Sequence, residues 1–225
     1  SKRIEKLAAP VDILLTGDVD AEIREPADVW QEIGLFREEQ PVRMAGNIVV
    51  ERTRVTACLD APYGAFSASS VTGMATTPRM VITIENQTTF HSEARRRHDE
   101  EVLLIYTAGM PTPAWRAMYA RLLGGLPSGV PVYHWGDIDE GGFRIAFILA
   151  QDAKLAGHTL QPWMMHPDDV PEDRRVKARP HTLERIRRFA SAAGWETLGS
   201  EIAKAGFTVE QEGLPVVGRE QLCSS

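Results

Sequence analysis

Three carboxylates in this sequence follow segments that have the composition of buried strands. Glu85 comes directly after the apolar run Met80–Ile84, and Asp137 and Asp139 follow the run 130–135. Side chains alternate along an extended backbone, so an Asp-x-Asp pair presents both carboxylates on the same side. Carboxylates that lie close together repel one another unless a cation neutralises them. The pattern therefore predicts an acidic site at strand ends that holds a divalent cation.

The residues around the Asp-x-Asp pair favour Mg²⁺ over zinc. Mg²⁺ prefers oxygen ligands, usually one or two carboxylates completed by water and substrate phosphate. No Cys accompanies the acids, and His134 ends an apolar strand, where we expect it to be packed or to support a ligand. Gly141 and Gly142 then allow a sharp turn into the apolar helix expected at 143–150.

A second Asp-x-Asp provides a comparison within the same chain. Asp18 and Asp20 also follow an apolar segment, but neither a glycine pair nor an apolar helix comes after them, so we predict a solvated turn. The glycine-rich segment 123–129 lacks the Gly-Lys-Ser/Thr ending of a phosphate-binding loop. A Gly-x-Ser-x-Gly nucleophile elbow and a His-Glu-x-x-His zinc motif are both absent from the sequence.

The elements that must position these acids alternate between strand and helix from residue 79 onward. Apolar runs of strand length lie at 80–84, 101–106 and 130–135, and helices are predicted at 112–123 and 143–150. Strands separated by helices pair in parallel through right-handed crossovers. The fold class predicted is α/β, with a mainly parallel sheet flanked by helices.

We predict three regions. Residues 1–78 form an N-terminal mixed α/β segment, residues 79–165 the catalytic core, and residues 166–225 a C-terminal helical extension. The small, polar stretch 63–78 is expected to be a linker with at most one edge strand. Other expected elements are strands at 47–51 and 54–58 and amphipathic helices at 182–190 and 195–205.

Composition limits the class of protein. The chain has 225 residues, 43% of them hydrophobic and 25% charged, as in a globular domain. No run approaches the ~18 apolar residues of a membrane span, so we expect no membrane partner. The net charge of -6 argues against a protein that coats nucleic acid through bulk charge, although a basic stretch at 174–188 offers a local surface.

The cysteines and the first residues predict the cellular compartment and the origin of the chain. Cys58 and Cys223 have no metal-binding spacing and are expected to be free thiols in a reducing compartment, by default the cytoplasm. The chain opens with Ser-Lys-Arg rather than Met, from which we expect a piece of a longer protein.

The combined motifs resemble a known family. Residues 82–86, 107–114 and 134–145 are similar to a Toprim domain, and more narrowly to the C-terminal part of the JetD family, the nuclease subunit of the Wadjet anti-plasmid system. That family is related to the A subunit of topoisomerase VI. The resemblance implies a Toprim-like fold, Mg²⁺ or Mn²⁺ as cofactor, Glu85 as a metal ligand or general acid/base, and Asp137 and Asp139 as metal ligands.

The activity implied by this resemblance is hydrolysis of phosphodiester bonds in double-stranded plasmid DNA by a metal-dependent endonuclease within an SMC-like defence complex. Topoisomerase-like relatives attack with a Tyr from an upstream domain that this chain lacks, so we expect water as the nucleophile. Cutting both strands favours a homodimer. Candidate DNA-binding residues are Arg144, Arg174, Arg175, Lys177 and Arg179.

Two alternatives stay open at the level of sequence. A non-catalytic DNA-binding or assembly module would use the same basic surfaces without cleavage. A phosphatase of the haloacid-dehalogenase kind also uses Asp-x-Asp at a strand end, with Asp137 as nucleophile. That class has Ser or Thr soon after the pair, whereas Gly141 and Gly142 follow here.

Overall fold

The computed structural model describes residues 7–17, 29–30, 32–34 and 40–209, and the chain divides into two compact units, 1–40 and 41–225. In the first unit, helix α2 (Ala8–Thr16) ends at Gly17, whose positive φ of 70° suits a residue without a side chain. Asp18, Asp20 and Cys223 lie outside the described residues. The domain boundaries expected after residues 78 and 165 stay predictions.

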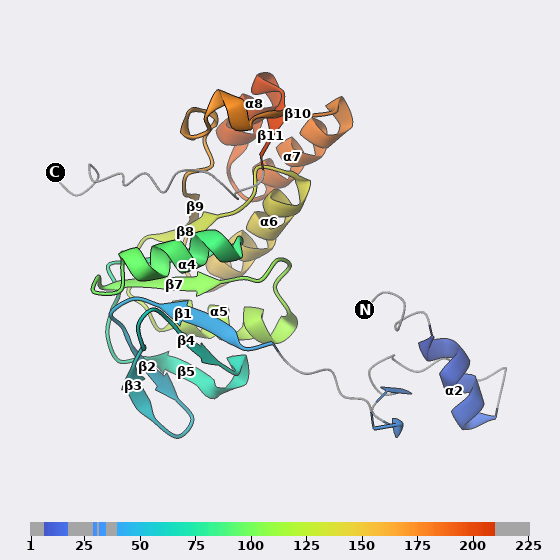
Figure 1. The fold of residues 1–225 in the computed structure, drawn as a ribbon, viewed down its shortest axis with the longest axis vertical. Coiled ribbons are helices and arrows are strands. Elements are labelled where there is room, and N and C mark those ends of the chain that lie inside the picture. Colours follow the sequence, from blue (N-terminus) through green and yellow to red (C-terminus); the bar gives the residue numbers. More distant parts are fainter. Residues whose placement is uncertain (1–6, 18–28, 31, 35–39, 210–225) are drawn as a thin grey trace. The chain divides into compact units, whose positions relative to one another are not determined.

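A six-stranded sheet forms the centre of the second unit, with the strand order β4-β1-β7-β6-β8-β9 (Figure 1). Its members are β1 (Val42–Ala45), β4 (Gly64–Phe66), β6 (Met80–Ile84), β7 (Val102–Tyr106), β8 (Val132–Trp135) and β9 (Leu160–Pro162). Strands β7, β6, β8 and β9 pair in parallel, while β1 and β4 are antiparallel additions at one side. The predicted α/β class with a mainly parallel sheet is confirmed.

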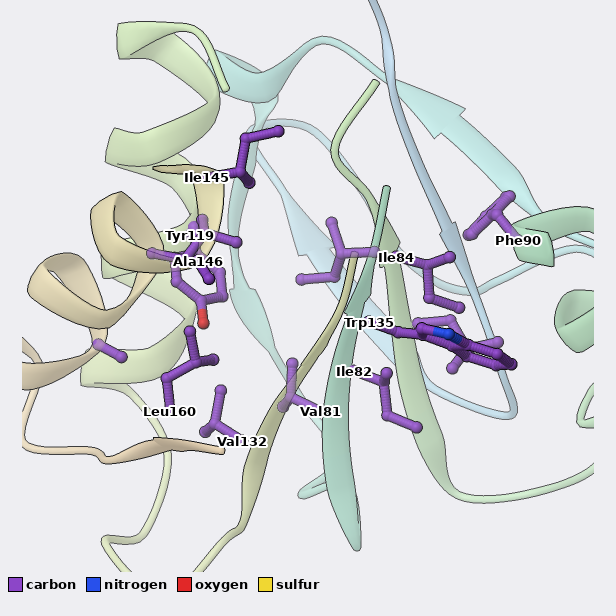
Figure 2. Close-up of a cluster of buried hydrophobic side chains, with 14 of the residues drawn as sticks. Val81, Ile82, Ile84, Phe90, Tyr119, Val132, Trp135, Ile145, Ala146 and Leu160 are labelled. Atoms are coloured by element: carbon purple, nitrogen blue, oxygen red, sulfur yellow. The ribbon is translucent and has the colours of Figure 1, made fainter. Parts of the chain in front are cut away.

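Helices cover both faces of this sheet. Helix α4 (Gln87–Arg96) packs on one face, and α5 (Pro113–Gly124) and α6 (Glu140–Leu155) pack on the other. Figure 2 shows Tyr119 of α5 and Ile145 of α6 on the side of Val81, and Phe90 of α4 on the opposite side. All these side chains are at most 3% exposed, as expected of strands that are covered on both faces.

Three of the helices begin with a side-chain cap just beyond the end of a parallel strand. Asn86 accepts a hydrogen bond from the Thr89 backbone N–H at the start of α4, and Asp139 accepts one from Gly142 at the start of α6. Thr112 caps α5 in the same way, with a proline at the first turn. Such caps satisfy backbone N–H groups that have no partner within the helix. They bring polar side chains to the edge of the sheet where the parallel strands end.

The expectation of a linker with at most one edge strand at 63–78 is wrong. This segment supplies β4 to the central sheet, the short 3₁₀ helix η1 (Ala68–Ser70), and β5 (Val71–Met74) to a second sheet with the order β3-β2-β5. The other strands of that sheet are β2 (Val49–Arg52) and β3 (Thr56–Cys58). Gly64 in β4 is closely packed, because a Cβ there would lie 2.4 Å from the Phe66 ring.

The C-terminal region confirms the two predicted amphipathic helices. Helices α7 (Pro180–Ala192) and α8 (Glu196–Ala205) pack against each other, and α7 also packs against α6. Shorter elements are η2 (Pro167–Asp169), η3 (Glu172–Arg174), and a two-stranded sheet of β10 (Val176–Lys177) and β11 (Phe207–Thr208). The Trp195 indole N–H donates to the Leu160 carbonyl oxygen at 2.9 Å, which ties α8 to β9. Within the described ranges, no helix combines the length and apolarity that crossing a membrane requires.

Candidate functional site

Neighbouring parallel strands bring Glu85 and Asp137 to the same edge of the sheet. Ile84 of β6 is paired with Trp135 of β8, and the Glu85 N–H donates to the Trp135 carbonyl oxygen at 3.0 Å. The Asp137 backbone N–H in turn donates to Glu85 Oε2 at 3.2 Å. Residues 52 positions apart in the chain therefore lie in direct contact. Asp137 is also partly buried.

The environment of Glu85 disfavours its negative charge. Burial raises the pKa of the Glu85 carboxyl from 4.5 to about 7, and repulsion from Asp137 and, more weakly, from Asp139 acts in the same direction. The hydrogen bond from the Asp137 N–H acts in the opposite direction. A cation beside this group would favour the ionised form, because an opposite charge offsets both burial and repulsion.

Asp139 has a local structural role. Its Oδ1 accepts a hydrogen bond from the Gly142 N–H at 2.7 Å, so the carboxylate caps the N-terminus of α6. The partial positive charge of a helix N-terminus stabilises such a carboxylate. Gly142 permits the tight turn, since a Cβ there would lie 2.2 Å from the Asp137 carbonyl oxygen.

The donor set fits a hard cation. Glu85 and Asp137 supply carboxylate oxygens at one strand edge, and Mg²⁺ commonly takes one or two carboxylates together with water and phosphate. Among the residues that the structure describes, no three Asp, Glu, His or Cys side chains are grouped closely enough to hold a metal ion. Glu85 and Asp137 are the acids of this edge that could hold such an ion. The assignment of Glu85, Asp137 and Asp139 as metal ligands stays a prediction.

His134 lies directly behind this pair, fully buried. The Thr83 hydroxyl donates to the Tyr133 carbonyl oxygen at 3.1 Å and lies 2.9 Å from His134 Nδ1. The Thr83 hydroxyl thus links β6 to the imidazole and to the backbone of β8. Burial lowers the pKa of His134 to about 3, so the ring is neutral.

His134 Nε2 and Glu85 Oε2 converge on Gly136. A Cβ at Gly136 would lie 2.6 Å from His134 Nε2 and 3.0 Å from Glu85 Oε2. In the described part of the chain, Nε2 is buried without a hydrogen-bond partner. The motif drew attention to His134, but its link to Thr83 and the need for Gly136 depend on strand pairing, which no local pattern encodes.

The basic residues predicted to bind DNA do not share one environment. Arg144 on α6 is exposed, as are Arg174, Lys177 and Arg179 in the C-terminal region. Arg175 instead donates to the carbonyl oxygens of Val170 and Pro167 and lies over the Phe207 ring, 4.8 Å from its centroid. Arg175 therefore holds this region together.

Helix α7 is linked to the first turn of α6. Arg185 Nη1 donates to both carboxylate oxygens of Glu140, at 2.7 and 3.0 Å. Glu140 directly follows Asp139, so the link connects α7 to the acidic edge. A hollow of about 790 Å³ lies along α7 and α8, and its lining mixes basic residues such as Arg187 and Arg188 with acidic ones. Neither Glu85 nor Asp137 lines this hollow.

Comparisons with known proteins agree with this architecture. The family described as "Wadjet protein JetD, C-terminal" matches residues 41–220, which coincides closely with the second compact unit. The Wadjet protein JetD of Bacillus cereus (strain Q1) is 29% identical over 207 residues, covering 86% of this chain and 49% of that relative. The chain thus spans about half the length of the curated relative that it matches. Since the family match covers most of its length, the chain belongs to the Wadjet JetD family.

Proposed function

We propose that this chain carries the catalytic centre of a divalent-metal-dependent DNA endonuclease. The observation that supports the proposal is the contact of Glu85 with the Asp137 segment at the carboxyl edge of a parallel sheet. Functional groups in open α/β sheets collect at this edge. The raised pKa of Glu85 adds to it, because burial and repulsion between the acids are offset when a cation binds. The Toprim-like character of the sheet belongs to the same proposal.

Each residue then has a defined task. When bound, Mg²⁺ or Mn²⁺ neutralises phosphate charge and lowers the pKa of a coordinated water. Glu85 and Asp137 supply the carboxylates that hold the ion. The Asp137 N–H orients Glu85 Oε2, while Gly136 and Gly142 leave space for both groups. Exposed Arg144 lies one turn beyond the start of α6, where it can contact a DNA phosphate.

The proposal includes a biological setting. The relative carries the Wadjet name, and we propose that this chain acts on plasmid DNA in a Wadjet-type complex with SMC-like subunits in the cytoplasm. A single centre cuts one strand, so we also propose a homodimer that presents two centres to a duplex.

The test measures nicking and linearisation of supercoiled plasmid with Mg²⁺, Mn²⁺ or EDTA. We expect Glu85→Gln and Asp137→Asn each to lower the cleavage rate at least a hundredfold, an estimate typical for the loss of one electrostatic group at a reacting centre. Glu101→Gln is the matched control, because Glu101 is exposed at the opposite end of β7. Cleavage at the parent's rate by both Glu85→Gln and Asp137→Asn would refute the assignment.

A second measurement does not depend on activity. Mn²⁺ binding, followed by electron paramagnetic resonance, should weaken in Glu85→Gln and Asp137→Asn and stay unchanged in Glu101→Gln. Asp139→Asn separates the two possible roles of Asp139, because Asn caps a helix as well as Asp does. If this variant keeps the stability of the parent but loses Mn²⁺ binding, Asp139 is a ligand as well as a cap.

One observation favours a second candidate. No group of three metal-ligating side chains is found among the described residues, and a non-catalytic DNA-binding or assembly module would need none. Such a module predicts DNA binding that is unaffected by EDTA and by Glu85→Gln, with no cleavage under any condition. The Mn²⁺ measurement separates the candidates, since only the nuclease requires the ion.

A further inference from the structure

A second cluster at the carboxyl edge of the sheet combines one arginine with aromatic rings. Arg43 of β1 places its guanidinium carbon 5.3 Å from the Tyr106 ring centroid and 6.0 Å from that of Tyr63. The His91 ring stacks on Tyr63, with centroids 5.2 Å apart and an interplanar angle of 19°. Phe90 lies next to both tyrosines and supports them. The aromatic rings therefore fix the position of a guanidinium on the α4 side of the sheet.

The positive charge of Arg43 has no counterpart within the described ranges. Arg43 forms no ion pair there, and its Nη1 is buried without a hydrogen-bond partner. His91 Nε2 is likewise buried and unpartnered. Burial, together with the charges of Arg43 and Arg95, lowers the pKa of His91, so His91 is neutral near pH 7. A guanidinium without a carboxylate is costly to keep in a partly buried place, and an anion would satisfy it.

The strand register places this cluster close to the acidic pair. Met44 is paired with Ile105, so Arg43 lies beside Tyr106, and Tyr106 is paired with Ile84, the residue before Glu85. The backbones at Arg43 and Glu85 are thus two strand positions apart, about 10 Å at the usual strand spacing. Phosphates follow one another closely along a DNA strand, so a single strand can place one phosphate at each of these two places.

We propose that Arg43, held between Tyr63 and Tyr106, is a binding site for a DNA backbone phosphate on the same strand as the phosphate that is cleaved at Glu85. The inference rests on the proposed nuclease function and specifies how its substrate is held. A phosphodiester strand fits both places, because the same polyanion meets a cation at Arg43 and a metal ion at the acidic pair. The site recognises phosphate rather than base sequence, since a stacked guanidinium presents charge and N–H donors to the backbone.

The test is a salt titration of DNA binding by the whole chain in EDTA, followed by the fluorescence anisotropy of a short labelled duplex. Each phosphate contact contributes about 0.9 to the slope of log K against log salt concentration. Arg43→Gln should reduce the magnitude of that slope by about 0.9 and weaken binding at low salt about tenfold. Arg43→Lys should keep the slope, because the charge remains, while binding weakens through the loss of guanidinium stacking.

Arg54→Gln is the matched control. It removes the same charge from an exposed position between β2 and β3 of the other sheet, so slope and affinity should stay those of the parent. Melting curves of each variant, followed by circular dichroism, show that it is folded. An unchanged slope in Arg43→Gln, an equal reduction in Arg54→Gln, or a parent that shows no salt-dependent binding would each overturn the site. This assay contains no metal and therefore does not depend on cleavage. If only the nuclease proposal is wrong, the Arg43 effect on DNA binding persists, and the separate plasmid assay shows no cleavage.

Discussion

Replacing Glu85 by Gln should remove a pH dependence of stability that the site predicts for the parent. The pKa of Glu85 rises from 4.5 to about 7 on folding because of burial and repulsion from Asp137 and Asp139. The folded state thus favours the neutral acid, and ionisation destabilises it. This cost is absent below about pH 4.5 and complete above about pH 7, where it amounts to about 3 kcal/mol. Gln keeps the oxygen that accepts from the Asp137 N–H and carries no charge at any pH.

The assay is urea unfolding of parent and Glu85→Gln, both in EDTA, across this pH range. The two proteins should have nearly equal free energies of unfolding near pH 4.5, and the variant should be about 3 kcal/mol more stable near pH 8. Mg²⁺ should then stabilise the parent at the higher pH and leave the variant unchanged, since ligands that bind the native state stabilise it. A stability difference that does not vary with pH would refute the reasoning, because the raised pKa would then be absent.

Three other substitutions test the packing around the site. Gly142→Ala should destabilise the fold and abolish metal binding, because its Cβ would lie 2.2 Å from the Asp137 carbonyl oxygen, whereas Gly124→Ala has open space and should be neutral in thermal melts. Arg116→Met should lower the free energy of unfolding by about 2 kcal/mol, because it removes both 2.7 Å hydrogen bonds to the buried Asp152. Adding Asp152→Asn should recover part of this loss. Urea titrations measure the free energy of unfolding of both variants. Arg175→Gln should lower the free energy of unfolding by about 2 kcal/mol, because the hydrogen bonds to the backbone carbonyl oxygens are lost. If the melting temperature of the variant equals that of the parent, Arg175 has no structural role and is again a candidate for DNA binding.

The central strands were predictable because their physical constraints are local. A strand covered by helices on both faces must be apolar along its whole length, and Met80–Ile84 was predicted with the bounds that the structure has. The meeting of Glu85 with Asp137 followed from the same logic, since both acids end parallel strands. Adjacent pairing of these strands then brought the two groups into contact.

Other elements escaped prediction because their partners are distant or polar. Helix α4 buries Glu93, which is 1% exposed and bonds to Arg96 and Arg97, so its inward face lacks the apolar spacing that signals a helix. Strand β1 is only four residues long, and its neighbours β4 and β7 lie far along the chain. The cluster around Arg43 depends on that unpredicted strand, which explains why no sequence pattern indicated it.

The distribution of charge at the acidic edge favours one place for the proposed cation. Asp139 already has a stabilising partner, because it caps α6 and faces the positive end of that helix. The Glu85 carboxylate accepts one hydrogen bond from a backbone N–H, while burial and the neighbouring carboxylates disfavour its negative charge. Neutral His134 lies behind it. The charge that a cation would offset therefore lies at Glu85. A divalent ion that binds Glu85 and Asp137 needs only water and a phosphate oxygen to complete its coordination, which leaves the substrate a direct place at the metal.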